Sequence, residues 1–297
     1  MKIDILGTKI DALTQQQALE KIESFFNPQS SVTGHESLVI GHQIITANPE
    51  IVLAAKKNKK YQDLINNASL VLADGIGLLW AAKFLSLKSN SWLTSIIQAK
   101  FSLLSLIFCP SYYKEILPER ITGVDLMEKI CERAAQKNWK IYLLGAGEGI
   151  AQKTAEVLKK RYHNLNIVGA ASGPTIQDTR YKSQETKNIQ DAITNIQTAA
   201  PDILFVAMGS PKQDFFINSL ITNHQSPITN LKLAMGVGGA FDFISGQAKR
   251  APAIFRNLGL EWLYRFFHQP WRAIRIFNAT IRFIWNVVIY KKLKIKN

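Results

Sequence analysis

The chain has 297 residues, of which 47% are hydrophobic and 20% are charged. This composition supplies a sizeable apolar core and excludes a disordered chain. The two cysteines, Cys109 and Cys131, are too few for a disulfide framework, and Met1 does not open a signal-peptide pattern. The sequence therefore favours a cytoplasmic globular protein with one large or two ordinary domains.

The formal net charge of +14 is concentrated near the C-terminus. From Arg250 to Asn297 the chain contains ten Lys or Arg residues and one acid, Glu261. A basic terminal segment indicates a polyanionic partner, either nucleic acid or an anionic membrane face.

The N-terminal third predicts short strands and helices in alternation. Short strands are expected over 2–6 and 9–13, followed by a helix from the N-cap Thr14 to about residue 26. A strand over 38–46 runs into T-A-N-P-E, where Pro49 suits the first turn of a helix ending near Lys60. Thr46 and Asn48 therefore lie at the carboxyl end of a strand, where each has either a capping role or a ligand-binding role.

The stretch S-L-V-L-A-D-G-I-G-L-L-W, from Ser69 to Trp80, is the strongest candidate for the chemistry. Leu70–Ala73 predicts a buried strand, so Asp74 lies at its carboxyl end. In an open α/β sheet that position faces the ligand crevice. The alternative is that Asp74 caps a helix beginning near Gly75.

The section from Phe84 to Pro118 has the character of an insertion. It contains the uncharged run Phe101–Tyr113, which is shorter than the roughly 20 residues that span a bilayer. Two interpretations stay open here, an interfacial or flap-like element and a hairpin packed on the core.

From Arg120 onward the alternation of strands and helices resumes. Strands are expected over 140–144, 166–170, 202–207 and 232–235, and helices to about residue 138, to about residue 162 and over 181–197. This pattern predicts a Rossmann-like α/β fold with a mainly parallel sheet and helices on both faces.

Three glycine-bearing turns follow strands and indicate a phosphate-bearing ligand. The turn G-A-G-E-G is not a full G-x-G-x-x-G, and no acid follows the next strand, which argues against a nicotinamide cofactor. No P-loop and no D-x-D pair occur, and the five histidines are scattered. We therefore expect nucleotide chemistry without a cofactor or a tightly held metal.

Six motifs occur in order along the chain: T-A-N-P-E, A-D-G-I-G, R-I-T-G-V-D-L, G-S-P-K-Q, the run from G-V-G-G-A-F-D-F-I-S-G to A-P, and L-G-L-E-W-L-Y-R. Together they resemble the WecG/TagA/CpsF glycosyltransferase family over nearly the whole chain. The resemblance implies inverting, metal-independent transfer of a sugar, typically N-acetylmannosamine or its uronic acid, from a UDP donor. The implied acceptor is a polyprenyl-diphosphate-linked sugar at the cytoplasmic membrane face, in synthesis of a cell-surface polysaccharide or a teichoic-acid-type polymer.

The resemblance also implies residue roles. Asp74 matches the general base, Thr46 and Asn48 line the same pocket, Arg120 acts near the diphosphate, and Gln213 is the pocket glutamine. The family usually has Glu after that glutamine, whereas this chain has Asp214. The glycine turns are expected to bind the donor through Gly145, Ala146, Gly147, Gly209, Pro211, Gly236, Gly238, Gly239 and Asp242.

The C-terminal residues predict a basic amphipathic appendage over 246–297, after an α/β core over 1–245. Beyond Pro270, one helical face carries the apolar residues Ile274, Phe277, Ile281, Ile284 and Val288. The opposite, polar face carries Arg272, Arg275 and Arg282. The pattern is imperfect, because the polar side also contains Ile276, Phe283 and Tyr290. We expect this appendage to bind an anionic membrane surface or the acceptor, using Arg265, Arg272, Arg275 and Arg282, with docking on the core as the alternative.

Two other functional classes stay open: a nucleotide-dependent oxidoreductase and a basic nucleic-acid-binding protein. The family resemblance favours neither, so we expect no nucleic-acid partner, while a homo-oligomer is compatible with the sequence.

Overall fold

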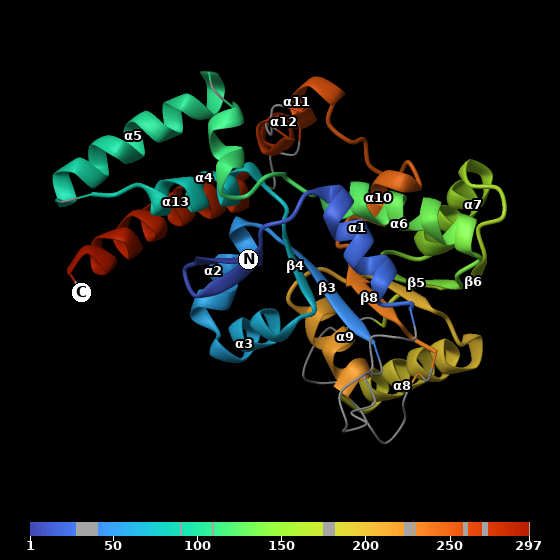
Figure 1. The fold of residues 1–297 in the computed structure, drawn as a ribbon. Coiled ribbons are helices and arrows are strands. Elements are labelled where there is room, and N and C mark those ends of the chain that lie inside the picture. Colours follow the sequence, from blue (N-terminus) through green and yellow to red (C-terminus); the bar gives the residue numbers. More distant parts are fainter. Residues whose placement is uncertain are drawn as a thin grey trace.

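The fold centres on a six-stranded sheet in which every neighbouring pair is parallel (Figure 1). The computed structural model describes residues 1–27, 41–89, 91–108, 110–174, 182–222, 228, 230–257, 261–268 and 273–296. The strands, in spatial order, are β4 (Leu70–Ala73), β3 (His42–Ala47), β8 (Leu233–Gly236), β7 (Ile203–Ala207), β5 (Ile141–Gly145) and β6 (Ile167–Ala171). The prediction of a Rossmann-like α/β fold is confirmed.

Helices cover both faces of this sheet (Figure 1). One face packs against α1 (Gln15–Ser24), α6 (Gly123–Lys137), α7 (Ile150–Arg161) and α10 (Ala240–Ile244). The other packs against α2 (Pro49–Lys57), α3 (Lys59–Asn67), α8 (Lys182–Ala199) and α9 (Lys212–Thr222). Successive strand residues such as Ile44 and Ile45 point to opposite faces and are both fully buried, which explains the continuous apolar runs of the strands.

The N-terminal elements within the described residues follow the prediction except at one helix. Residues 38–40 of the strand expected over 38–46 lie outside the described residues, and β3 begins at His42. β1 (Lys2–Ile5) and β2 (Thr8–Asp11) form an antiparallel hairpin, and Thr14 caps α1 in a capping box. The single helix expected to end near Lys60 is instead two helices that meet at Asn58. Asn58 has extended backbone angles, and its side chain accepts a hydrogen bond from Tyr61 N at 3.2 Å, so it ends α2 and caps α3.

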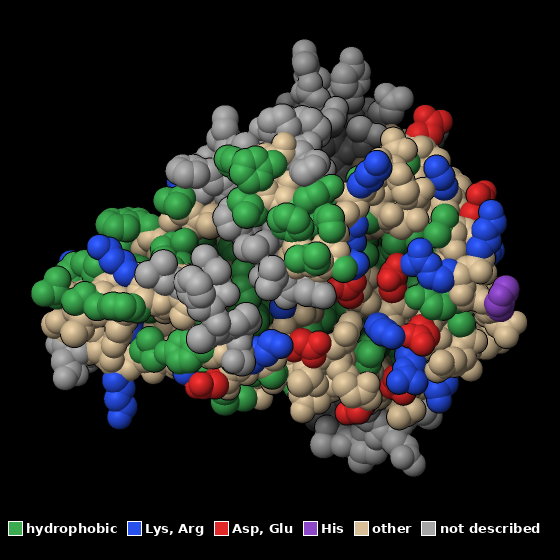
Figure 2. Space-filling view, turned by 90° about the horizontal axis from the view of Figure 1, so that it is seen from above, with side chains coloured by type: hydrophobic (Ala, Val, Ile, Leu, Met, Phe, Trp, Pro, Cys, Tyr) green, Lys and Arg blue, Asp and Glu red, His purple; other side chains and the backbone are tan. Residues whose placement is uncertain are grey.

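The section over 84–118 is helical and packs on the core. It begins at the end of α4 (Ile76–Ser86) and contains α5 (Trp92–Phe108) and the 3₁₀ helix η2 (Pro110–Glu115). α5 lies against α4 and α13 (Ala273–Lys296), so the inner side of the section behaves as the hairpin interpretation predicts. Its outer side is apolar and exposed. Figure 2 shows hydrophobic side chains over α5.

The C-terminal residues form α11 (Ala253–Asn257), α12 (Glu261–His268) and α13. α13 packs on α2, α4 and α5, and Phe283, Val287 and Val288 belong to the same core cluster as β3 and β4. The predicted apolar face is therefore wrong only in part. Val288 is buried as expected, but Phe283, expected on the polar side, is 1% exposed, whereas Ile281 is 50% exposed. The side chains of Ile274 and Phe277 lie outside the described residues. The core that α13 must cover, and not its own amphipathic pattern, decides which side is buried. Among the helices of the described ranges, none has the length and hydropathy needed to cross a bilayer.

Candidate active site

The predicted site residues gather at one edge of the sheet. β4, β3, β8, β7 and β5 are consecutive neighbours, and all five are parallel, so their carboxyl ends lie at the same edge. The last residues of these strands and the segments that follow them carry the predicted site residues: Asp74, Thr46, Asn48 and the turns at Gly236, Gly209 and Gly145. This edge is where ligands bind in open α/β sheets.

Asp74 is held directly beyond β4. Its backbone N–H donates to Ala47 O at 2.7 Å, and its Oδ2 accepts from Gly123 N, at the start of α6, at 3.2 Å. The capping interpretation of Asp74 is wrong for α4, because the N-cap of that helix is Gly75. Gly75 has φ of +148°, a backbone conformation that favours glycine, so the chain turns sharply from strand to helix here.

Thr46 and Asn48 have different roles although they are two residues apart. Thr46 lies within β3, is 8% exposed, and is so close to Gly123 that a Cβ at Gly123 would lie 3.0 Å from Thr46 Oγ1. Thr46, Asp74 and the N-terminus of α6 therefore form one cluster. Asn48 is the N-cap of α2, and its Oδ1 accepts from Ile51 N at 3.0 Å, so the capping alternative is correct for Asn48.

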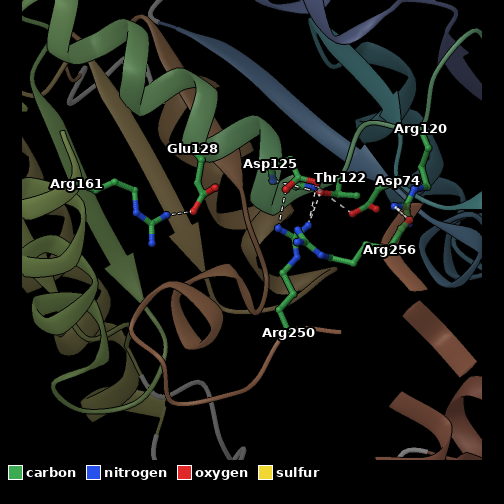
Figure 3. A network of polar contacts seen from close by, with 9 residues as sticks. Asp74, Arg120, Thr122, Asp125, Glu128, Arg161, Arg250 and Arg256 are labelled. Carbon is green, nitrogen blue, oxygen red and sulfur yellow. Dashed lines mark hydrogen bonds and ion pairs between the residues drawn. The ribbon is translucent and has the colours of Figure 1, made fainter. Parts of the chain in front are cut away.

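Arg120 connects the site to the C-terminal residues. Its Nη2 donates to the backbone carbonyl oxygen of Arg256 at 2.6 Å, and the neighbouring Ile121 N donates to Ala73 O at the end of β4. This guanidinium thus holds the segment around α11 beside the site (Figure 3). A contact of Arg120 with a diphosphate stays a prediction.

A second arginine, which the sequence reasoning did not select, forms the main contact of that segment. Arg250 Nη1 donates to Asp125 Oδ1 at 2.6 Å, and its Nη2 donates to Asp125 Oδ2 at 2.9 Å and to Thr122 Oγ1 at 3.2 Å (Figure 3). Thr122 is the N-cap of α6 and Asp125 lies in its first turn. The bidentate pair therefore fixes residues 247–257, which we call the arm, to the helix that contacts Asp74.

Positive charge collects around this contact. Burial would raise the pKa of Asp125, but hydrogen bonds from Arg250 and Thr122 and the charges of Arg250 and Arg256 hold it below its ordinary value. The Nε atoms of Arg250 and Arg256 are buried and have no hydrogen-bond partner among the described residues. The α6 N-terminus adds further positive potential. The signal that could have identified these residues is the run R-A-P before α11 together with the T-G-V-D start of α6.

Gln213 joins two of the glycine turns. It is 4% exposed, and its Oε1 accepts from Gly209 N at 3.0 Å and from Gly238 N at 3.1 Å. A Cβ at Gly236 would lie 2.4 Å from Gln213 Nε2, so glycine is required where the amide passes β8. Gln213 therefore holds the turns after β7 and β8 in a fixed relation.

Asp214, where the resembled family has Glu, is accommodated inside the protein. It is 1% exposed, lies in the first turn of α9, and its Oδ2 accepts from Tyr61 Oη at 2.5 Å. Gln43 Nε2 also donates to Asp214 O at 3.0 Å. Burial raises the pKa of Asp214 above its ordinary value. Asp214, which is shorter than the Glu of the resembled family, thus joins α9 to α3 through its hydrogen bond with Tyr61.

The remaining donor-site candidates differ in exposure. Gly145 packs against β7, since a Cβ there would lie 2.5 Å from Ala207 O, whereas Gly147 is exposed beyond the strand. Ala146 has positive φ and donates its N–H to Ala207 O at 2.7 Å. Pro211, Gly239 and the half-buried Gly209, Gly238 and Asp242 line the same sheet edge. Their contact with a nucleotide stays a prediction.

The predicted acceptor arginines lie mostly outside the described side chains. Arg282 is exposed on α13, whereas the side chains of Arg265 and Arg275, and the whole of Arg272, are not described. Within the described ranges, no three His, Cys, Asp or Glu side chains come together in a group that could hold a metal ion.

Comparison with known proteins gives a matching family and several similar proteins. The model of the glycosyl transferase WecG/TagA/CpsF family matches residues 3–99 and 105–297. The chain is also similar to proteins of Staphylococcus aureus strains MRSA252, MW2 and NCTC 8325 named N-acetylglucosaminyldiphosphoundecaprenol N-acetyl-beta-D-mannosaminyltransferase. Each is 31% identical over 295 residues, which cover 99% of this chain and 95% of the relative.

Proposed function

Because the chain belongs to the glycosyl transferase WecG/TagA/CpsF family, we propose that it moves N-acetylmannosamine or a related hexose from a UDP-sugar to a polyprenyl-diphosphate-linked saccharide. The relatives' name points to an N-acetylglucosaminyl-diphosphate acceptor on undecaprenol. The product would enter synthesis of a cell-surface polysaccharide or teichoic-acid-type polymer at the inner face of the cytoplasmic membrane.

The observation that carries the proposal is the position of Asp74. Its carboxylate lies beyond a parallel strand, next to Thr46 and the N-terminus of α6. Inverting transfer in a single displacement needs one base to remove the proton of the acceptor hydroxyl as that oxygen attacks the anomeric carbon. Asp74 is the carboxylate we assign to this step.

The departing UDP takes up the electron pair of the broken glycosidic bond, and its negative charge must be stabilised. Backbone N–H groups of the glycine turns and the start of α6 are suited to phosphate oxygens. Arg250 and Arg256 add cationic charge from the arm, and Arg120 positions that arm by its bond to the carbonyl of Arg256.

We propose that this stabilisation operates without a metal ion. The chain contains no D-x-D pair, the usual means of holding a divalent ion on a sugar diphosphate. Transfer should therefore persist in excess chelator. Loss of transfer that added Mg²⁺ or Mn²⁺ restores would contradict this assignment.

The test of the function is transfer with a panel of UDP-sugars and a lipid-diphosphate acceptor, read by mass spectrometry of the product. Asp74→Asn should keep UDP affinity while turnover falls ~100-fold or more. Asp202→Asn is the matched control, because Asp202 lies at the opposite end of the strands and bonds Lys140 N. Turnover of Asp74→Asn within a fewfold of the parent would reject Asp74 as the base.

A further inference from the structure

α5 and α13 are far apart in sequence but lie side by side (Figure 1). Lys291 of α13 is 4% exposed and donates through Nζ to Gln98 Oε1 of α5 and to Phe84 O of α4, both at 2.8 Å. Lys292 lies over the ring of Trp92, 4.8 Å from its centroid. These contacts join the helices into one unit on top of α4.

The inner sides of both helices are buried and their outer sides are apolar. Six large hydrophobic side chains are exposed there, out of ten in the described residues: Leu93 (67%), Ile97 (46%), Phe101 (69%), Ile281 (50%), Trp285 (61%) and Leu293 (56%). On α5 they recur every four residues, and on α13 at four- and eight-residue intervals, so each set forms a stripe along its helix. Figure 2 shows hydrophobic side chains over α5 on this side of the molecule.

The charges of the same surface have one sign. Neither α5 nor α13 contains an Asp or Glu, whereas Lys100 and Arg282 are exposed beside the stripes. Exposed apolar residues flanked by cations match the boundary between headgroups and acyl chains in an anionic leaflet. A second copy of this chain would bring its own cations against these, so charge complementarity favours lipid over self-association.

We propose that the outer faces of α5 and α13 together form a membrane-contact surface that inserts its apolar stripes into an anionic bilayer. The inference rests on the proposed function, because a polyprenyl-linked acceptor lies in the membrane. It assigns a role to the section over 84–118 that the family resemblance does not supply. Since α4 begins at Ile76, two residues after Asp74, and carries both helices, docking of this surface would set the distance of the site from the lipid.

The test measures co-sedimentation of the full chain with vesicles of equal parts phosphatidylglycerol and phosphatidylcholine, and with phosphatidylcholine vesicles alone. Replacing both Ile97 and Phe101 by Ser should lower partition into the anionic vesicles at least about tenfold. Lys100→Glu should lower partition at low salt and have little effect at high salt, because screening removes its contribution. Phe215→Ser is the matched control, since Phe215 is 38% exposed on α9, and it should bind as the parent does.

Unchanged partition of the Ile97/Phe101 double variant would overturn the proposal. A second result would also overturn it. In that result, sedimentation velocity shows the parent associating through this surface without lipid, and the substitutions leave vesicle binding unchanged. The double variant should keep the parent's circular dichroism and its transfer to a short-chain, water-soluble acceptor. Vesicle binding does not depend on turnover, so a failure of the proposed function is recognised separately.

Discussion

The contact between Arg250 and Asp125 offers the sharpest test of how the arm serves the site. Asp125→Asn removes the carboxylate charge that accepts hydrogen bonds from both Nη atoms of Arg250 but keeps the size of the side chain. The substituted amide cannot form the same bidentate pair, so Arg250 would stay partly buried without a counter-charge. We expect the arm to leave the N-terminus of α6 more often.

The magnitude follows from the exposure of the two side chains. One-sided removal of a fully buried pair costs roughly 3–5 kcal/mol, and an exposed pair is worth roughly 0–1 kcal/mol. Here Arg250 is 17% and Asp125 39% exposed, so solvent screens the pair in part, and a cost of about 1.5–2 kcal/mol is expected. Each 1.4 kcal/mol corresponds to about a tenfold change in an equilibrium. kcat/KM should therefore fall about 10- to 30-fold.

The pH dependence has a defined sign. The pKa of Asp125 is lowered in the folded protein from an ordinary 3.8, so the folded state binds its proton less tightly than the unfolded state does. The stability that this carboxylate contributes is therefore present above about pH 3.8 and is lost as the pH falls through the lower, folded value. Asp125→Asn should remove that part of the acid dependence.

The assays are kcat/KM for transfer, urea unfolding, and the rate of tryptic cleavage after Lys249 and Arg250 in the arm. Glu128→Gln is the matched control. Glu128 lies on α6, as Asp125 does, but it pairs with Arg161 of α7, away from Asp74 (Figure 3). It should change kcat/KM less than about twofold, as a partly exposed pair does. Equal effects of the two substitutions on transfer and on cleavage would refute the idea that the arm acts on the site.

Gly236→Ala should lower turnover and destabilise the fold by about 1–3 kcal/mol in urea unfolding, because the added Cβ would displace Gln213 from the two backbone N–H groups it bonds. Retention of both activity and stability would show that the amide can shift without consequence. Burial lowers the pKa of Lys291 to about 8 from 10.5, so the free energy of unfolding should rise by about 1–2 kcal/mol as the pH increases from 8 to 10. Lys291→Met should lose this rise in the same unfolding series, and an identical pH profile in the two proteins would contradict the burial argument.

Local sequence signals determined most of the fold and part of the site. The apolar runs, the glycine breaks and the cap at Thr14 act within a few residues, so the alternation of strands and helices and the position of Asp74 after a strand could be predicted. The division at Asn58 was missed, because one polar residue within a helical pattern does not by itself show that the backbone becomes extended there.

Tertiary structure decided the roles that depend on partners distant in sequence. Thr46 and Asn48 both suit a helix cap, and only the arrival of α6 beside Thr46 separates their functions. The Arg250–Asp125 pair joins residues 125 positions apart, which no local spacing encodes. The buried side of α13 likewise depends on the core it covers, because its sequence has apolar residues on more than one side and hydrophobic burial has no direction of its own.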